Sequence, residues 1–168
     1  MAIVQFINAE YIKNYTPIGK LVSIEQIKPT NIEVQDSWIQ DQLGSNFYVY
    51  LQTQYQSQTL NANEQILLTK IEPAQAYRVA EQMLPFVNWQ INNKGVMTQS
   101  GDFAASSDLT NMKYLRNELR NRAEFYAKRL SVYLCDNADL FPEYTVDNST
   151  DMKPSPSGYD DCGLFLYD

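Results

Sequence analysis

Histidine is absent from the 168 residues of this chain. Its absence removes the most common general base of enzymes, the usual partner of a catalytic nucleophile and the most common zinc ligand. The sequence also contains no Gly-rich phosphate-binding loop, no Gly-x-Ser-x-Gly motif and no Cys-x-x-Cys pair. Glu64, Glu72 and Glu81 remain as candidates for acid–base chemistry, but no motif supports them. We therefore expect a protein that is not an enzyme and has no catalytic, cofactor-binding or metal-binding residues.

Positive charge is scarce as well. The chain has 13 Lys and Arg against 20 Asp and Glu, a net charge of -7. This balance disfavours a protein that grips phosphate backbones in general. The N-terminal apolar run, residues 1–7, has no basic residue and is too short for a secretion signal or a membrane anchor. We expect a soluble protein that is made in the cytoplasm and has no membrane partner.

Cysteine occurs only twice, at Cys135 and Cys162. The two residues could form a disulfide, but we do not expect one because the cytoplasm keeps thiols reduced. Asp160 and Asp161 precede Cys162, and this cluster has neither EF-hand nor zinc-site spacing. No metal site is expected in this segment.

The sequence does contain many apolar residues at helical spacing. Hydrophobic residues make up 44% of the chain, which is enough for a core. Apolar residues recur at steps of three and four over about residues 32–56, 61–90 and 108–136, and each stretch predicts a helix. Asn8 is expected to cap a further short helix over residues 9–14.

Prolines and capping residues set the expected ends of these helices. Residues 21–28 stop at Pro29, so we expect them to be irregular and the next helix to begin at a capping box of Thr30 and Glu33. Pro85 is expected to bend the following helix or to divide it in two. Residues 89–98 alternate between apolar and polar around an Asn-Lys-Gly turn, which is typical of a small hairpin.

These elements predict a mainly α protein. We expect a compact helical bundle of four to five helices, with a small hairpin or projecting loop near residues 89–99 and an extended C-terminal tail. The helical domain is placed at residues 1–144, and residues 145–168 are expected to form a flexible linker and an apolar docking segment. The linker has too little apolar surface to offset its ordering entropy. The expected protein-docking residues at the end of the tail are Leu164, Phe165, Leu166 and Tyr167.

The last long helix carries much of the positive charge. Glu118 with Arg122, and Glu124 with Lys128, have the i,i+4 spacing of pairs that support a solvated helix. A solvated or subunit-facing surface is therefore favoured over phosphate contacts. If copies pack side by side, this face could also meet the acidic tail. The candidate subunit-interface charges are Arg116, Arg120, Arg122, Lys128 and Arg129.

The order of the apolar motifs resembles that of a known family. The motifs are Trp38-Ile39, Leu43-Gly44, Phe47-Tyr48-x-x-Leu51, Ile66-Leu67-Leu68, Ile91 to Gly95-Val96 and Tyr133-Leu134. Together with the order of helices, they resemble the head-tail connector, or adaptor, proteins of tailed bacteriophages, in particular those of crAss-like phages. The resemblance covers about residues 3–144.

This resemblance implies a helical bundle that assembles, usually as a dodecamer, into a ring in the virion at the head-tail interface. The implied partners are the portal protein, neighbouring copies in the ring, and tail or second-ring proteins. The lumen would continue the DNA channel without sequence-specific binding. The family has no catalytic residues to carry over. Two alternatives remain open: a tail-completion or stopper protein, and a small soluble helical regulator that binds another protein.

Overall fold

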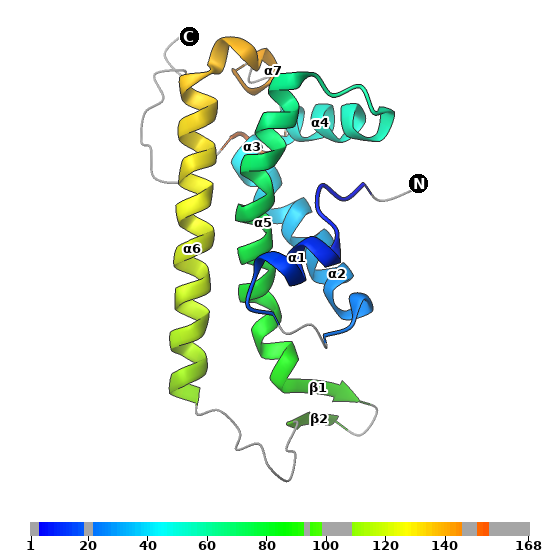
Figure 1. Cartoon of the computed structure of the whole chain (residues 1–168), viewed down its shortest axis with the longest axis vertical. Helices are drawn as coiled ribbons and strands as arrows, with labels where there is room; N and C mark the ends of the chain where they lie inside the picture. The colour runs from blue at the N-terminus through cyan, green and yellow to red at the C-terminus, as the bar shows by residue number, and fades with distance from the viewer. Residues whose placement is uncertain (1–3, 19–21, 93–94, 99–108, 146–150, 155–168) are drawn as a thin grey trace.

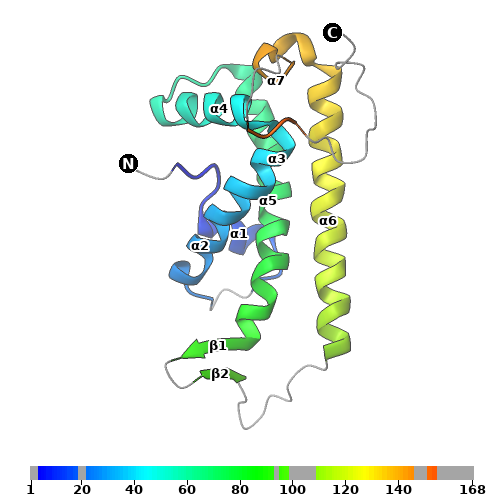
Figure 2. The same cartoon turned by 180° about the vertical axis from the view of Figure 1, so that it is seen from behind.

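The computed structural model of the chain is built around two long helices that lie side by side. It describes residues 4–18, 22–92, 95–98, 109–145 and 151–154. The long helices are α5 (Ala62–Asn88) and α6 (Leu109–Asp136), and they run in opposite directions (Figures 1 and 2). The shorter helix α2 (Ile24–Val34) packs on the opposite side of α5 from α6, and α1 (Ala9–Tyr15) packs against α5 and α2. The expected mainly helical bundle is therefore confirmed.

Helix α2 begins earlier than the sequence analysis predicted. Its N-cap is Ser23, whose side chain accepts a hydrogen bond of 3.3 Å from the backbone N–H of Gln26. The expectation that residues 21–28 are irregular is wrong for residues 24–28. Pro29 lies inside the helix, where its missing N–H has a local cost. Burial of Ile27 and Val34 in the core offsets that cost.

The helix that was expected over residues 32–56 is divided at Gly44. Helix α2 continues through a π-helix, η1 (Gln35–Ile39), into α3 (Gln40–Leu43). Gly44 then adopts φ +75° and ψ 151°, and α4 (Ser45–Ser57) begins after it. Backbone of this kind is essentially restricted to glycine, so Gly44 ends one helix and starts another.

Part of the expected linker packs against this junction. The backbone N–H of Ser45 donates to the Met152 carbonyl at 2.9 Å, and the Met152 N–H donates back to Ser45 Oγ at 3.2 Å. The Ser45 hydroxyl donates to Asp151 Oδ2 at 2.7 Å. Residues 151–154 thus lie against the start of α4, although they had been assigned to a flexible linker.

Gly44→Ala is expected to lower the free energy of unfolding by about 2 kcal/mol. A Cβ at this position would lie 2.7 Å from Pro154 Cδ and 2.9 Å from the Pro154 nitrogen, and the φ of +75° is unfavourable for alanine. Thermal denaturation should show a midpoint lower by about 5 °C. Asn46→Ala, on the exposed side of α4, is the matched control. Equal midpoints for the two variants would refute the prediction.

The remaining elements follow the sequence more closely. Helix α5 runs unbroken past Pro73 and Pro85, so the alternative of two helical pieces is excluded. Strands β1 (Trp89–Asn92) and β2 (Gly95–Thr98) pair antiparallel, with Trp89 opposite Thr98, which confirms the hairpin. After α6, a short 3-10 helix, η2 (Ala138–Leu140), leads to α7 (Pro142–Thr145).

The core has two parts along α5. One part joins α3, α4, α5, the C-terminal half of α6 and α7, and the other joins α1, α2 and α5. Among the residues whose burial the structure describes, the largest fully buried side chains are Phe47, Phe141, Ile12, Ile27, Ile39, Leu43, Leu51, Leu67, Ile71, Met83, Leu130 and Leu134.

Buried amide side chains hold the N-terminal residues to this core. The backbone N–H of Phe6 donates to Gln35 Oε1 at 2.8 Å, and Gln35 Nε2 donates to the Val4 carbonyl at 2.8 Å. Asn31 Nδ2 donates to the Ile7 carbonyl at 2.9 Å. These bonds satisfy backbone groups that would otherwise be buried without partners.

Cys135 is the one cysteine within the described part of the chain. Cys135 lies on α6 and is disulfide-bonded, so the expectation that the cysteines stay unpaired is wrong at this residue. Cys162 lies outside the described residues.

Candidate protein-interaction surface

Helix α6 buries only one of its faces. The buried apolar residues recur at steps of three and four and point toward α5 and the core: Leu119, Ala123, Ala127, Leu130 and Leu134. Tyr114 and Phe125 are 73% and 58% exposed. At 100° per residue both lie on the side of the helix opposite the buried stripe. Two large exposed aromatic side chains, three turns apart, mark this side as a candidate interface.

The sequence-predicted basic residues fall into three groups in the structure. Arg116 and Arg120 reach across to Glu81 of α5, with N–O distances of 3.0 Å for each. Arg122 pairs with Glu118 at 3.1 Å, as its i,i+4 spacing predicted. The other predicted pair, Glu124 with Lys128, is not among the ion pairs formed within the described part of the chain. Lys128 and Arg129 instead line a groove, described below.

Glu81 is the centre of a buried ionic cluster. Its side chain is 1% exposed and accepts from Arg116 and Arg120 on one oxygen and from Arg78 Nη1 on the other, at 2.7 Å. Arg116 and Arg120 remain 44% and 42% exposed. Charge-assisted hydrogen bonds of this length offset the cost of burying the carboxylate. Glu81 therefore locks α6 against α5.

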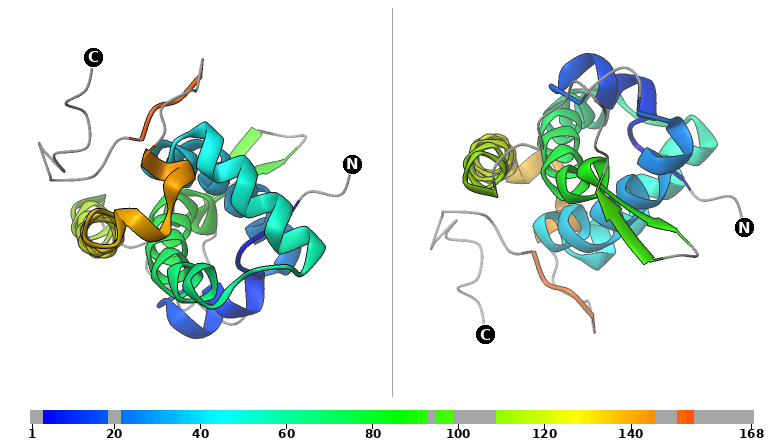
Figure 3. Two further views of the ribbon diagram at one scale, coloured as in Figure 1. Left: turned by 90° about the horizontal axis from the view of Figure 1, so that it is seen from above. Right: turned by 90° about the horizontal axis from the view of Figure 1, so that it is seen from below.

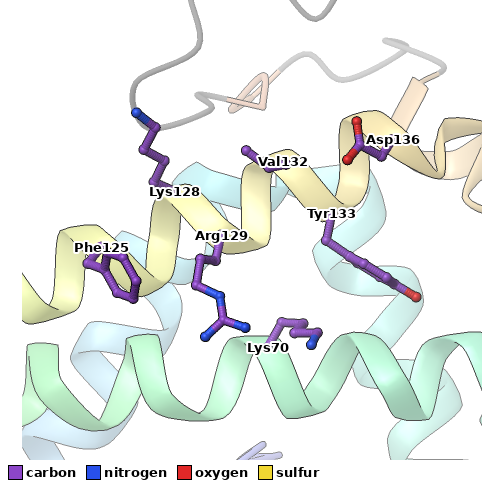
Figure 4. Close-up of a pocket in the computed structure, with 7 residues that line it drawn as sticks. All are labelled: Lys70, Phe125, Lys128, Arg129, Val132, Tyr133 and Asp136. Carbon is purple, nitrogen blue, oxygen red and sulfur yellow. The ribbon is translucent and has the colours of Figure 1, made fainter.

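An open groove of about 540 Å³ runs along α6, which supplies six of its described lining residues, and Lys70 lines it from α5. In Figure 4, Arg129 extends from α6 toward α5, whereas Lys128 points away from α5. The Arg129 guanidinium lies 6.0 Å from the Phe125 ring centre, and Lys70 Nζ lies 5.9 Å from that of Tyr133. The lining residues are Lys70, Phe125, Lys128, Arg129, Val132, Tyr133 and Asp136.

The groove combines three cations and one carboxylate with apolar walls. Such a surface suits an acidic segment of protein that carries an aromatic or aliphatic side chain. The sequence analysis named Lys128 and Arg129 but missed Lys70, because no pattern in the sequence sets which residue of α5 lies opposite them.

Four tyrosines join α1, α5 and α6 beside this face. Tyr77 and Tyr126 are stacked with ring centres 5.6 Å apart, and Tyr15 packs against both. Tyr11 is stacked on Tyr15 at 5.3 Å. Burial, followed by the nearby carboxylate of Glu72, raises the pKa of Tyr11 to about 12.

Tyr11 should make the chain less stable as the pH rises above 10. Unfolded tyrosine ionises near pH 10, while folded Tyr11 keeps its proton up to a pKa of about 12. The unfolded state therefore binds fewer protons, and stability present below pH 10 is lost between pH 10 and 12. Tyr11→Phe should reduce this slope by up to about 1.4 kcal/mol per pH unit.

Urea denaturation at several pH values measures the slope of the free energy of unfolding. Tyr114→Phe, which removes an exposed phenol from α6, is the matched control. An unchanged slope in Tyr11→Phe would contradict the prediction.

The remaining predictions from the sequence concern the tail, metal binding and membrane insertion. The docking residues Leu164, Phe165, Leu166 and Tyr167 lie outside the described residues. Within the described ranges, no three His, Cys, Asp or Glu side chains gather as a metal site. No described helix combines the length and apolarity needed to cross a bilayer.

Comparison with known proteins assigns part of the chain to a protein family. Residues 39–153 match a family described as "Family of unknown function (DUF6712)". The match begins at the end of η1 and includes residues 151–153, which pack against α4. No curated protein and no solved structure matches the chain.

Proposed function

We propose that this chain, which belongs to the DUF6712 family of unknown function, is a structural protein of a bacteriophage particle. In this proposal it is a head-tail connector: neighbouring copies form a ring, usually of twelve, between the portal protein and the tail or second-ring proteins. The ring continues the DNA channel without reading the DNA sequence.

The observation that carries this proposal is the open face of α6. A helix of 28 residues that buries one side and exposes Tyr114 and Phe125 on the other has the anatomy of an assembly surface. The groove beside it adds a charged and aromatic site for a protein segment. The absence of histidine and the resemblance of the apolar motifs to connector proteins favour a structural role over catalysis.

The tail has a part in the same proposal. Leu164, Phe165, Leu166 and Tyr167 would anchor residues 159–168 on the portal, a neighbouring copy or the next ring. Deletion of residues 159–168 is expected to leave the thermal transition of the domain intact and to impair completion of particles. Loss of the thermal transition would show that these residues belong to the core of the domain.

Native mass spectrometry and negative-stain microscopy test the ring. The purified chain is mixed with the portal protein of its particle, and a ring-sized assembly on the portal supports the proposal. A ring that binds the tail end but not the portal would instead support a stopper or tail-completion protein. A stable dimer or monomer under all conditions would overturn the proposal and support a soluble regulator.

A further inference from the structure

Cys135 on α6 is disulfide-bonded, and the chain has only one other cysteine, Cys162. The partner of Cys135 is therefore either Cys162 of the same chain or a cysteine of a second copy. A disulfide brings the Cα atoms of its two residues to within about 7 Å of each other. The choice between the two partners depends on whether the chain can bring its own Cys162 to α6.

The tail leaves the described part of the chain within reach of Cys135. Pro154 packs against the junction between α3 and α4. Leu43, at the end of α3, and Leu134, next to Cys135, belong to one core cluster. Cys162 follows Pro154 by eight residues, which can span about 27 Å, more than two helix diameters. A tether of this length holds Cys162 at about millimolar effective concentration, well above that of a second copy in dilute solution.

Cys135 also lies at one end of the groove along α6. It is next to Asp136 and three residues after Val132, and both of these line the groove. Around the helix axis, Cys135 and Val132 are about 60° apart. From Asp136 the lining extends to Phe125, which is about 16 Å along the helix. In the end-on views α6 lies at one side of the molecule next to α5, and no described helix covers its outer side (Figure 3).

The residues that follow Cys162 match the groove in length and in chemistry. Residues 163–167 span about 17 Å when extended. Four of these five residues are leucine, phenylalanine or tyrosine. The groove offers Phe125, Val132 and Tyr133 as apolar and aromatic contacts. A disulfide at Cys135 would place this segment at the end of the groove, where its side chains can be covered.

We infer that Cys135 is bonded to Cys162 of the same chain, and that this bond holds residues 163–167 in the groove along α6. Oxidised glutathione or a similar small disulfide is the oxidant. The thiolate of one cysteine attacks this disulfide and releases one small thiol, and the thiolate of the other cysteine then displaces the second. The two cysteines lose two electrons and two protons, and the small disulfide becomes two thiols.

Charge contributes little to this contact. The lining has three cations and Asp136, and residues 159–168 have three aspartates and no cation, so the signs are compatible. Glu118 and Glu124 lie on the same helix outside the described lining, and their carboxylates weaken the attraction. The covalent bond and the apolar contacts therefore determine where the segment lies.

The functional consequence of this bond rests on the proposed function, because it regulates the docking segment. A reducing cytoplasm leaves residues 159–168 of a newly made chain free to dock on another molecule. Oxidation ties the same residues to α6 of their own chain and withdraws them from that partner.

Cleavage after Met152 identifies the bonded pair. The full chain is equilibrated with oxidised and reduced glutathione, acidified and cleaved with cyanogen bromide, which separates residues 113–152 from residues 153–168. Mass spectrometry should find these two fragments joined, and reduction should separate them. On a non-reducing gel the uncleaved chain should run as a monomer. Unlinked fragments or a disulfide-bonded dimer would overturn the inference.

Limited proteolysis tests whether the segment lies in the groove. Chymotrypsin should cleave after Phe165 at least about tenfold more slowly in the oxidised chain than in the reduced chain. Phe125→Asp and Val132→Asp each place a charge in the apolar lining, so cleavage should become fast although the disulfide remains. Phe125 is 58% exposed, so its variant is expected to fold. Asn121→Asp, an exposed position of α6 outside the described lining, is the matched control and should keep cleavage slow.

Equal cleavage rates in the oxidised and reduced chains, or slow cleavage in both groove variants, would contradict the placement in the groove. Ring formation with the portal separates this inference from the proposed function. If rings form with reductant present but the fragments are unlinked, the proposed function stands and this inference is wrong. If the fragments are joined and the segment is protected, yet no ring forms with reductant, the contact stands and the proposed function is wrong.

Discussion

Glu81→Gln is expected to lower the free energy of unfolding by about 3 kcal/mol. The substitution keeps the shape of the side chain but removes the negative charge that three arginines share. The guanidinium of Arg78 would then lie against an amide that offers one oxygen instead of two. Arg116 and Arg120 are more than 40% exposed, so water would partly solvate them. The expected loss is therefore at the low end of the range for a broken buried ion pair.

Urea and thermal denaturation, followed by circular dichroism, measure this loss. A chain of this size should show a thermal midpoint lower by about 10 °C. Glu118→Gln is the matched control, because it removes the same charge from an exposed pair with Arg122 and should cost less than about 1 kcal/mol. If both variants lose the same stability, Glu81 does not lock α6 to α5.

Phe47→Ala is expected to lower the free energy of unfolding by about 4 kcal/mol. Phe47 is 1% exposed and packs against Tyr50, Phe141 and Tyr144, with ring centres 5.7 to 6.3 Å apart. The alanine variant would lose these ring contacts and leave a cavity where α4 meets the segment that follows α6.

The same denaturation measurements apply to this variant. Phe86→Ala removes an exposed ring from α5 and should change the free energy of unfolding by less than about 0.5 kcal/mol. A loss below about 2 kcal/mol in Phe47→Ala would mean that the surrounding rings close the cavity.

The sequence predicted the features that depend on local patterns. The periodicity of α5 and α6 is local, and so is the turn between β1 and β2, so these elements lie near their expected ranges. The start of α2 could also have been predicted, because Ser23 and Gln26 have the spacing of a capping box. The prediction missed it because Pro29 was taken as a helix end.

Features that depend on distant residues could not be predicted in this way. Arg116 and Glu81 are 35 residues apart, and only the register of α6 on α5 brings them together. Their charges suggested interface or solvated positions, whereas the structure places Arg116 and Arg120 in a partly buried cluster. The contact between Ser45 and Asp151 spans 106 residues and depends on the backbone conformation of Gly44. No pattern in the sequence of the tail indicates this contact.

The junction at Gly44 also sets how the part of the chain that matches the family, residues 39–153, is connected to the rest of the chain. We call this part the family unit. Gln40, one residue after the start of the family match, donates to Asp151, two residues before its end, at 3.3 Å. The two ends of the unit are therefore neighbours in space. Whatever precedes residue 39 and whatever follows residue 153 leaves the unit from adjacent points, so a circular permutant that joins these ends should keep the same packing.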